Sequence, residues 1–206
     1  MELEMKYSIP GREIAEEIWN DPTLLELGDP CSRKKVVMKA VYFDTPDGLL
    51  SRNNVAFRVR SEDCRMVATL KWGGTAVDGF HARQEINVPV DGDSCFIATP
   101  KEIFKESEDG KMLIDLVGDR PLINLLETRF LRSQMRVRYG GSIMELAIDT
   151  GSIVTDNGEC PIMEAEIELY AGDPEDIRAF GEKLAEKYGL TAQNESKLKR
   201  GLDMIA

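Results

Sequence analysis

The stretch that decides the fold spans residues 55–90 and reads VAFRVRSEDCRMVATLKWGGTAVDGFHARQEINVPV. Its segments 55–60, 65–72 and 83–90 are rich in β-branched and alternating apolar residues, which predicts three strands. Gly73, Gly74 and Gly79 separate the last two. Strands joined by such short connections predict an antiparallel meander.

The flanking sequence continues the pattern in both directions. Residues 2–9 alternate between polar and apolar side chains, and Pro10-Gly11 ends that strand before a predicted helix at about residues 12–19. A further strand covers residues 36–44 and precedes the turn sequence Thr45-Pro46-Asp47-Gly48. With the three strands above, this strand makes four at short spacing in the predicted meander.

The C-terminal half resumes as strands after an interruption. Residues 94–126, with Ile97 and Leu125 among their apolar positions, lack alternation and predict short helices packed outside the sheet. Strands are predicted at 128–139, 142–149 and 161–170, then a helix opened by Asp173 as N-cap and Pro174, and a short closing segment at 196–204. Seven or eight strands with peripheral helices predict an α+β protein whose sheet forms a barrel or is strongly curved, in a single domain over residues 1–206.

Composition and charge restrict the classes of function. The chain has 206 residues, 42% hydrophobic and 31% charged, and a formal net charge of −11. A nucleic-acid or anionic-membrane partner is therefore not expected. The sequence contains neither a run of apolar residues long enough for a bilayer nor a secretory signal, so a cytoplasmic location is expected.

Cysteine and histidine offer little for chemistry. The four cysteines, at positions 31, 64, 95 and 160, are far apart and predict neither a zinc site nor a disulfide framework. His81 is the single histidine. Beside a glycine-rich turn we interpret it as a hydrogen-bonding residue or a residue at the rim of a site, in preference to a general base. We interpret Trp19 and Trp72 as packing residues.

Charged residues recur on single faces of the predicted strands, because side chains two apart point the same way. The same-face sets are Glu2, Glu4 and Lys6; Arg58 and Arg60; Thr69 and Lys71; Arg83 and Glu85; Arg132, Arg136 and Arg138; Glu145 and Asp149; and Glu164, Glu166 and Glu168. Any one set would ordinarily face solvent. Three glutamates on one face repel one another unless a cation lies among them, and carboxylates are the ligands that Mg²⁺ and Mn²⁺ prefer.

These sets also form part of an ordered series of motifs. The series runs Glu2-x-Glu4-x-Lys6, Tyr42-Phe43-Asp44-Thr45, Arg58-x-Arg60, Thr69-Leu70-Lys71, His81-x-Arg83-x-Glu85, Thr128-x-Phe130-x-Arg132, Glu145-x-x-x-Asp149-x-Gly151, Glu164-x-Glu166-x-Glu168 and Ser196-Lys197-x-x-Arg200-Gly201. The whole series resembles the CYTH, or triphosphate tunnel metalloenzyme, superfamily. It looks closest to the bacterial inorganic triphosphatases, many of which carry a second, helical CHAD domain.

The resemblance implies an eight-stranded antiparallel barrel, a triphosphate tunnel, whose charged faces point inward. It implies metal-dependent hydrolysis of inorganic triphosphate to diphosphate and phosphate with one or two Mg²⁺ or Mn²⁺ ions. The residues that it assigns to phosphate binding are Arg58, Arg60, Lys71, Arg83, Arg132, Lys197 and Arg200. The implied metal ligands are Glu2, Glu4, Glu166, Glu168 and Glu164, and the implied catalytic residues are Lys6, Glu85 and Asp149.

Two other functions remain open at this point. One is adenylate cyclase or thiamine or nucleoside triphosphatase activity, which needs a pocket for an organic group; the other is non-catalytic binding of polyphosphate or nucleotide. Two Glu-x-Glu sets argue against a pure anion binder, because such a protein gains little from many carboxylates. The sequence leaves the oligomeric state and the general base undetermined.

Overall fold

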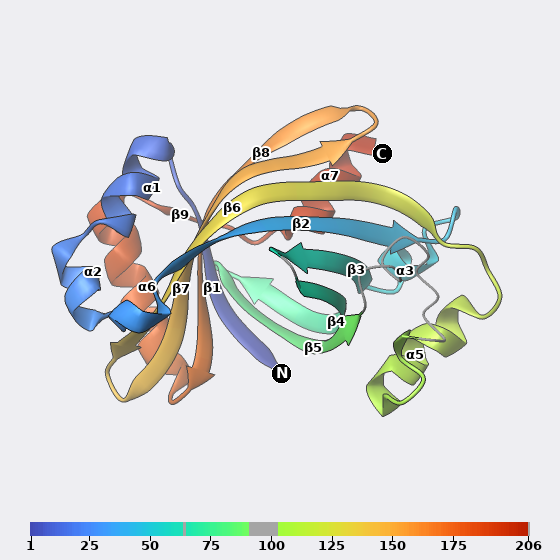
Figure 1. The fold of residues 1–206 in the computed structure, drawn as a ribbon, viewed down its shortest axis with the longest axis horizontal. Helices are drawn as coiled ribbons and strands as arrows, with labels where there is room; N and C mark the ends of the chain where they lie inside the picture. Colours follow the sequence, from blue (N-terminus) through green and yellow to red (C-terminus); the bar gives the residue numbers. More distant parts are fainter. Residues whose placement is uncertain (64, 91–102, 206) are drawn as a thin grey trace.

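The sheet of this protein closes into a barrel. The computed structural model describes residues 1–63, 65–90 and 103–205, so Cys64, Cys95 and Ile97 lie outside the described residues. The eight barrel strands are β1 (Glu2–Ser8), β2 (Lys34–Asp44), β3 (Val55–Glu62), β4 (Arg65–Val77), β5 (Phe80–Val90), β6 (Ile123–Tyr139), β7 (Ser142–Thr155) and β8 (Gly158–Ala171). Their order is β5-β4-β3-β2-β6-β7-β8-β1, every pairing is antiparallel, and β1 also pairs with β5, which completes the closure (Figure 1). The predicted eight-stranded antiparallel barrel is thus confirmed.

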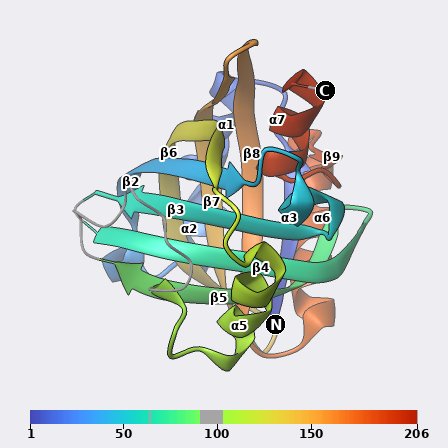
Figure 2. The same ribbon diagram turned by 90° about the vertical axis from the view of Figure 1, so that its right-hand side faces the viewer.

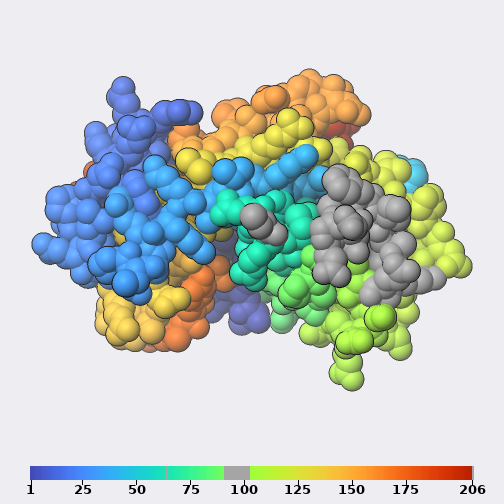
Figure 3. Space-filling view, in the orientation of Figure 1, coloured from blue at the N-terminus to red at the C-terminus, as the bar shows by residue number. Residues whose placement is uncertain are grey.

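Helices surround the barrel and gather at its ends. They are α1 (Arg12–Trp19), α2 (Pro22–Leu27), the 3₁₀ turn η1 (Pro30–Ser32), α3 (Leu49–Arg52), α5 (Glu108–Val117), α6 (Pro174–Tyr188) and α7 (Lys197–Ile205), and a ninth short strand, β9 (Thr191–Ala192), pairs with β1. Figure 1 shows α1, α2 and α6 together at one end and α5 at the other. The space-filling view shows the same separation, with the blue helices far from the yellow-green one (Figure 3).

Local chemistry explains the helix starts that the sequence predicted. The side chain of Asp173 accepts a hydrogen bond from the backbone N–H of Glu175, and Pro174 occupies the first helical position of α6. The same arrangement opens α2, where Asp21 precedes Pro22 and accepts from the N–H groups of Thr23 and Leu24. The helix α2 was absent from the sequence prediction.

One boundary prediction was wrong. Residues 123–126, including Leu125, were predicted as part of a helical region, whereas they open strand β6. This segment lacks alternation because the register shifts where it meets β2, between Tyr42 and Phe43, so its side chains do not follow a strict period of two.

The apolar core lies largely outside the barrel wall, which leaves the interior to charged residues. On β1, Met5 and Tyr7 point outward and pack under α1 and α6, with Ile18 and Phe180 in the same cluster. A second cluster covers the outer face of β3 and β4, where Phe57 packs against Phe104 and α5. Figure 2, turned by 90°, shows α5 in front of β4 and β5. Since successive side chains alternate between faces, burying Met5 and Tyr7 outside turns Glu2, Glu4 and Lys6 inward.

A third, smaller cluster fills part of the interior on the side of β2 and β6. It contains Met38, Tyr42, Phe130 and Ile153, and Leu198 of α7 packs against it. Helix α7 therefore closes one side of the barrel lumen with an apolar contact. In the part of the chain that the structure describes, the helices are too short or too polar to cross a bilayer.

Candidate active site

A cavity of about 650 Å³ occupies the barrel interior. Its charged lining is more basic than acidic, with eleven lysines and arginines against eight acidic residues, although the whole chain carries −11. Of the predicted site residues the cavity is lined by Glu2, Glu4, Lys6, Arg58, Arg60, Lys71, Arg83, Glu85, Arg132, Glu166, Glu168 and Lys197. Residues from strands at both ends of the sequence thus meet in one enclosed space.

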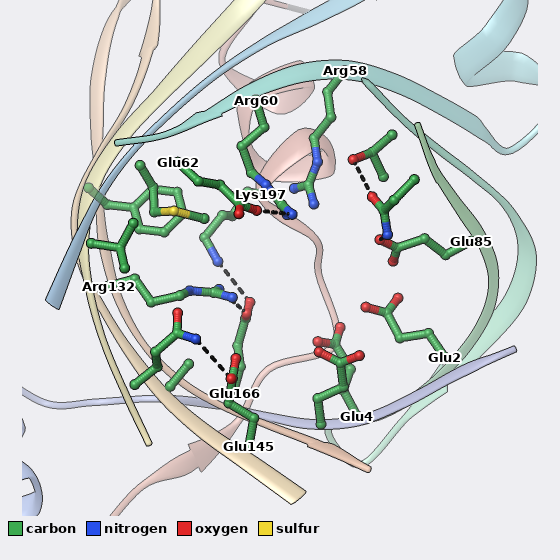
Figure 4. A pocket seen from close by; sticks show the side chains of 18 of the residues that line it. Glu2, Glu4, Arg58, Arg60, Glu62, Glu85, Arg132, Glu145, Glu166 and Lys197 are labelled. Atoms are coloured by element: carbon green, nitrogen blue, oxygen red, sulfur yellow. Dashed lines mark hydrogen bonds and ion pairs between the residues drawn. The ribbon is translucent and has the colours of Figure 1, made fainter. Parts of the chain in front are cut away.

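Opposite walls carry opposite kinds of side chain. Figure 4 shows Arg58 and Arg60 entering from β3 on one wall, while Glu2 and Glu4 rise from β1 on the facing wall. The strand register brings Glu4 beside Glu168 of β8 on one flank and beside His81 of β5 on the other. The acidic lining residues of the first and last barrel strands therefore lie on one part of the cavity wall. They are Glu2, Glu4, Glu166 and Glu168, and we call them the acidic cluster.

Three arginines point into the cavity without a full set of protein acceptors. The buried Nε atoms of Arg58, Arg60 and Arg83 make no hydrogen bond to the described residues. Arg58 donates from Nη1 to the Tyr42 hydroxyl over 3.1 Å, and Arg60 pairs with Glu62. Buried donors without partners are costly, so this arrangement favours an anionic ligand with several acceptor oxygens.

Lys71 bridges two carboxylates on the acidic side of the cavity. Its Nζ lies 2.6 and 2.9 Å from the two carboxylate oxygens of Glu2, and 2.6 Å from Oε2 of Glu85. Burial raises the pKa of Glu85, but the charge of Lys71, the hydrogen bond with Glu2 and the charge of Arg58 together lower that pKa to about 2. Asn87 donates to Oε1 of Glu85 over 2.7 Å and is itself held by Thr69, which fixes the carboxylate.

Lys6 connects the two ends of the acidic cluster. Its Nζ lies 3.3 Å from Glu4 and 3.1 Å from Glu166, and all three side chains are nearly inaccessible to solvent. Burial lowers the pKa of Lys6, but the charges of Glu166 and Glu4 more than offset this and hold the pKa above its ordinary range. Lys6 is therefore a fixed cation in the wall of the cavity.

A buried ion-pair network lies deeper, where α7 meets the barrel. Lys197 Nζ lies 2.9 Å from Asp149, 2.7 Å from Glu164 and 2.8 Å from Glu166. Arg132 donates to both oxygens of Asp149 and also pairs with Glu166, and Arg200 pairs with Glu164. The carboxylates of Asp149, Glu164 and Glu166 lie within 4.8 Å of one another, as in a metal site. Lysine and arginine already neutralise them, so the network anchors α7 to the barrel.

Within the acidic cluster, Glu2, Glu4 and Glu168 have fewer cationic partners among the described residues than the carboxylates around Lys197. Burial raises the pKa of Glu2 to about 8 despite the opposing charge of Lys71, and Glu4 and Glu85 add to the increase. Burial and then the charge of Glu85 raise the pKa of Glu168 to about 7. Glu168 makes no hydrogen bond or ion pair with the described residues. Buried carboxylates with too few cationic partners can be neutralised by a divalent ion, and carboxylate oxygens are the ligands that Mg²⁺ and Mn²⁺ prefer. Glu2, Glu4 and Glu168 therefore fit such an ion by donor type and charge.

Three predicted site residues do not line the cavity. Asp149 and Glu164 are buried behind Lys197, and Arg200 lies beyond Glu164, where it also donates to the carbonyl of Pro161. Arg136 lines both this cavity and a second, of about 570 Å³, at the barrel mouth, and Arg138 lines the second one. The face of β6 that carries Arg132, Arg136 and Arg138 therefore extends from the first cavity into the second.

Sequence reasoning missed some polar residues of the lining. Tyr42 holds Arg58, and Gln134 donates to Glu145 over 2.8 Å. Tyr42 belongs to the motif Tyr42-Phe43-Asp44-Thr45. It shares one face of its strand with Met38 and Ala40, and this two-residue spacing could have predicted that it points into the barrel. His81 lines the cavity, is 2% exposed and lies 2.7 Å through Nε2 from the carbonyl of Gln193. It is thus a buried hydrogen-bonding residue, which is the first of the two interpretations given above.

Comparisons with known proteins agree with this geometry. The sequence is 30% identical over 205 residues to a protein named inorganic triphosphatase from Haemophilus influenzae, covering 97% of this chain and 54% of the relative. This chain thus spans about half the length of the curated relative that it matches.

Solved structures share the fold. A protein from Hippeastrum, described as an adenylyl cyclase candidate with dominant triphosphatase activity, matches with a TM-score of 0.72 at 21% identity, covering 98% of this chain and 96% of that one. A Bacillus halodurans protein, described as an adenylate cyclase candidate, matches with a TM-score of 0.61 at 20% identity, covering 97% and 96%. The model of the CYTH domain matches residues 1–202. By that match over nearly its whole length, this chain belongs to the CYTH domain family.

Proposed function

We propose that this chain hydrolyses inorganic triphosphate to diphosphate and phosphate in the barrel cavity, with Mg²⁺ or Mn²⁺ bound at the acidic cluster. The observation that carries the proposal is the pairing, across one cavity, of incompletely satisfied arginines with glutamates that lack enough cations. The name of the Haemophilus relative supports the same substrate.

The arginines suit a substrate of high negative charge. Tripolyphosphate carries about four to five negative charges near neutral pH, and several fixed cations are needed to compensate them. Arg58, Arg60 and Arg83 present planar guanidinium groups that can each engage two phosphate oxygens. Lys71 and Arg132 line the same space and add to the positive field.

Glu2, Glu4 and Glu168 are the proposed metal ligands, with Glu166 and Glu85 beside them. A divalent ion bound there would supply charge neutralisation at the phosphate oxygens and lower the pKa of a water molecule. Phosphoryl transfer depends mainly on position and charge stabilisation. The residues of this chain therefore hold the phosphate chain in line, keep it away from bulk water and stabilise the charge that moves to the leaving oxygen.

Glu164, Asp149, Lys197 and Arg200 take a supporting role in this proposal. They hold one another, so they place α7 and keep Arg132 and Glu166 at the cavity wall. This assigns Asp149 and Glu164 to the scaffold of the site, in place of the catalytic and metal-binding roles that the resemblance implied for them.

The test is a phosphate-release assay with tripolyphosphate, ATP and thiamine triphosphate, each with Mg²⁺, Mn²⁺ or Ca²⁺. We expect metal-dependent release that is fastest from tripolyphosphate. Glu4→Ala and Arg58→Ala should suppress it, while Arg138→Ala, an exposed change outside this cavity, should not. Equal turnover in all three variants would refute the site, and faster release from an organic triphosphate would refute the substrate.

A further inference from the structure

Lys71 has an unusual position for a residue assigned to phosphate. Its ammonium lies between Glu2 of β1 and Glu85 of β5, within 2.9 Å of three carboxylate oxygens. Glu85 is its cross-strand neighbour in the β4–β5 register. All three side chains are at least four-fifths buried, so bulk solvent contributes little to neutralising this cluster.

Arg58 provides the contrast within the same cavity. It feels the charges of Glu85 and Glu2 through space but makes no ion pair with the described residues. Its hydrogen-bond partner is the hydroxyl of Tyr42. One buried cation is therefore available to an anion at once, while another must first leave its carboxylates.

The cluster around Lys71 remains short of positive charge. Oε2 of Glu85 lies 2.6 Å from Lys71 Nζ, yet it lacks a properly aligned hydrogen-bond donor among the described residues. Glu168 and Glu4 lie nearby and add further negative charge. A single ammonium holds the glutamates together but does not saturate their oxygens.

We propose that, in the free protein, the Lys71 ammonium occupies the place beside Glu2 and Glu85 that a divalent metal ion bound to Glu2 takes when the site is loaded, and that the displaced ammonium then turns to the phosphates. This rests on the proposed function, which supplies both the metal and the phosphate. Lysine suits the exchange because its charge sits on a flexible four-carbon stem. The same oxygens cannot accept from Lys71 and ligate a metal at full strength.

Two opposite consequences follow for binding. With Lys71 in place, a metal ion alone must displace an ammonium that has no phosphate to receive it, so its affinity is low. When phosphate is present, the ammonium moves to a new partner and both ligands bind more tightly. Such coupling is reciprocal, because each ligand must raise the affinity for the other by the same factor.

The experiment measures Mn²⁺ affinity without any phosphate, by titration calorimetry and by the electron paramagnetic resonance signal of free Mn²⁺. We expect Lys71→Met to bind Mn²⁺ about tenfold more tightly than wild type, within the usual range for coupled sites. Lys71→Arg, which keeps the charge, should retain wild-type affinity. If Lys71→Met does not fold by circular dichroism, Lys71→Gln should give the same tightening.

Arg58→Met is the matched control, since it removes a buried cation of the same cavity that does not touch Glu2 or Glu85. We expect it to change Mn²⁺ affinity much less than Lys71→Met. Equal tightening in both variants would mean that only the general field changed, which overturns the exchange. Unchanged or weaker Mn²⁺ binding in Lys71→Met overturns it as well. Failure of the wild type and all variants to bind Mn²⁺ would overturn the metal site of the proposed function itself, and the exchange with it.

Discussion

Arg132 and Asp149 form two parallel hydrogen bonds across β6 and β7, Nε to Oδ1 and Nη2 to Oδ2, each 2.7 Å long. The carboxylate is fully buried and also holds Lys197. This fork joins the cavity wall to the C-terminal helix.

Removing the charge of Asp149 should destabilise the protein strongly. In Asp149→Asn the ammonium of Lys197 and the guanidinium of Arg132 lose a shared partner while staying buried. Breaking a buried pair in this way costs about 3–5 kcal/mol. Urea denaturation at pH 7 measures the change, and a loss below about 1 kcal/mol would contradict the scaffold role that we give Asp149.

Gly151 should not tolerate a side chain. A Cβ at this position would lie 2.1 Å from the carbonyl oxygen of Arg129 on the neighbouring strand, and backbone cannot move aside cheaply. Gly151→Ala should therefore cost about 1–3 kcal/mol, the range for overpacked interiors. Gly141→Ala is the control, because a Cβ there meets no atom within 4 Å, and its unfolding midpoint should match that of the wild type.

The fold was more predictable from the sequence than the site, as Glu164 and Glu168 show. Alternation identified the inward faces of β1, β3 and β8, because burying one face of a strand fixes the direction of every second side chain. Alternation does not predict how far along the barrel a side chain lies or which partner it meets. Glu164 and Glu168 share a face four residues apart, yet Glu164 is buried against Lys197 and Glu168 lines the cavity. That difference depends on where α7 returns, which is a tertiary contact.

Asp21 should make stability depend on acid pH. Its 5% exposed carboxylate caps α2 and accepts from Lys187 and Tyr188 of α6. Burial raises its pKa, but these hydrogen bonds dominate and hold the pKa below its ordinary range. A depressed pKa contributes stability that is fully present above the unfolded value of about 3.9 and is lost as the pH falls through the folded value.

Asp21→Asn tests this contribution because asparagine can still cap the helix. We expect it to lower the free energy of unfolding at pH 7 by about 1–3 kcal/mol, the cost of losing hydrogen bonds to a charged group. The difference from wild type should shrink as the pH is lowered below about 4. Urea titrations between pH 7 and pH 3 provide the measurement, and a difference that stays constant across this range would contradict the mechanism.

Divalent metal should stabilise the folded protein in proportion to its binding. A ligand that binds only the folded state at 100 times its Kd adds about 2.7 kcal/mol. Mn²⁺ should therefore raise the Tm of the wild type, and Glu4→Gln should lose most of that increase because Glu4 belongs to the acidic cluster. Glu159→Gln, a change at an exposed residue near the start of β8, should keep the full increase. An equal Tm increase in Glu4→Gln would remove Glu4 from the metal site.

The closure of the barrel also has a consequence for how the chain folds. Strand β1 lies between β5 and β8, so it can pair with β8 only after residues Gly158–Ala171 have been synthesised. Pairings over such long sequence separations form slowly, because the chain must close a large loop before any contact rewards it. Glu2 and Glu4 travel with that strand. The barrel wall is thus sealed in the same late step that brings the acidic residues of its two ends together, and an incompletely folded molecule has no assembled site with which to capture its ligands.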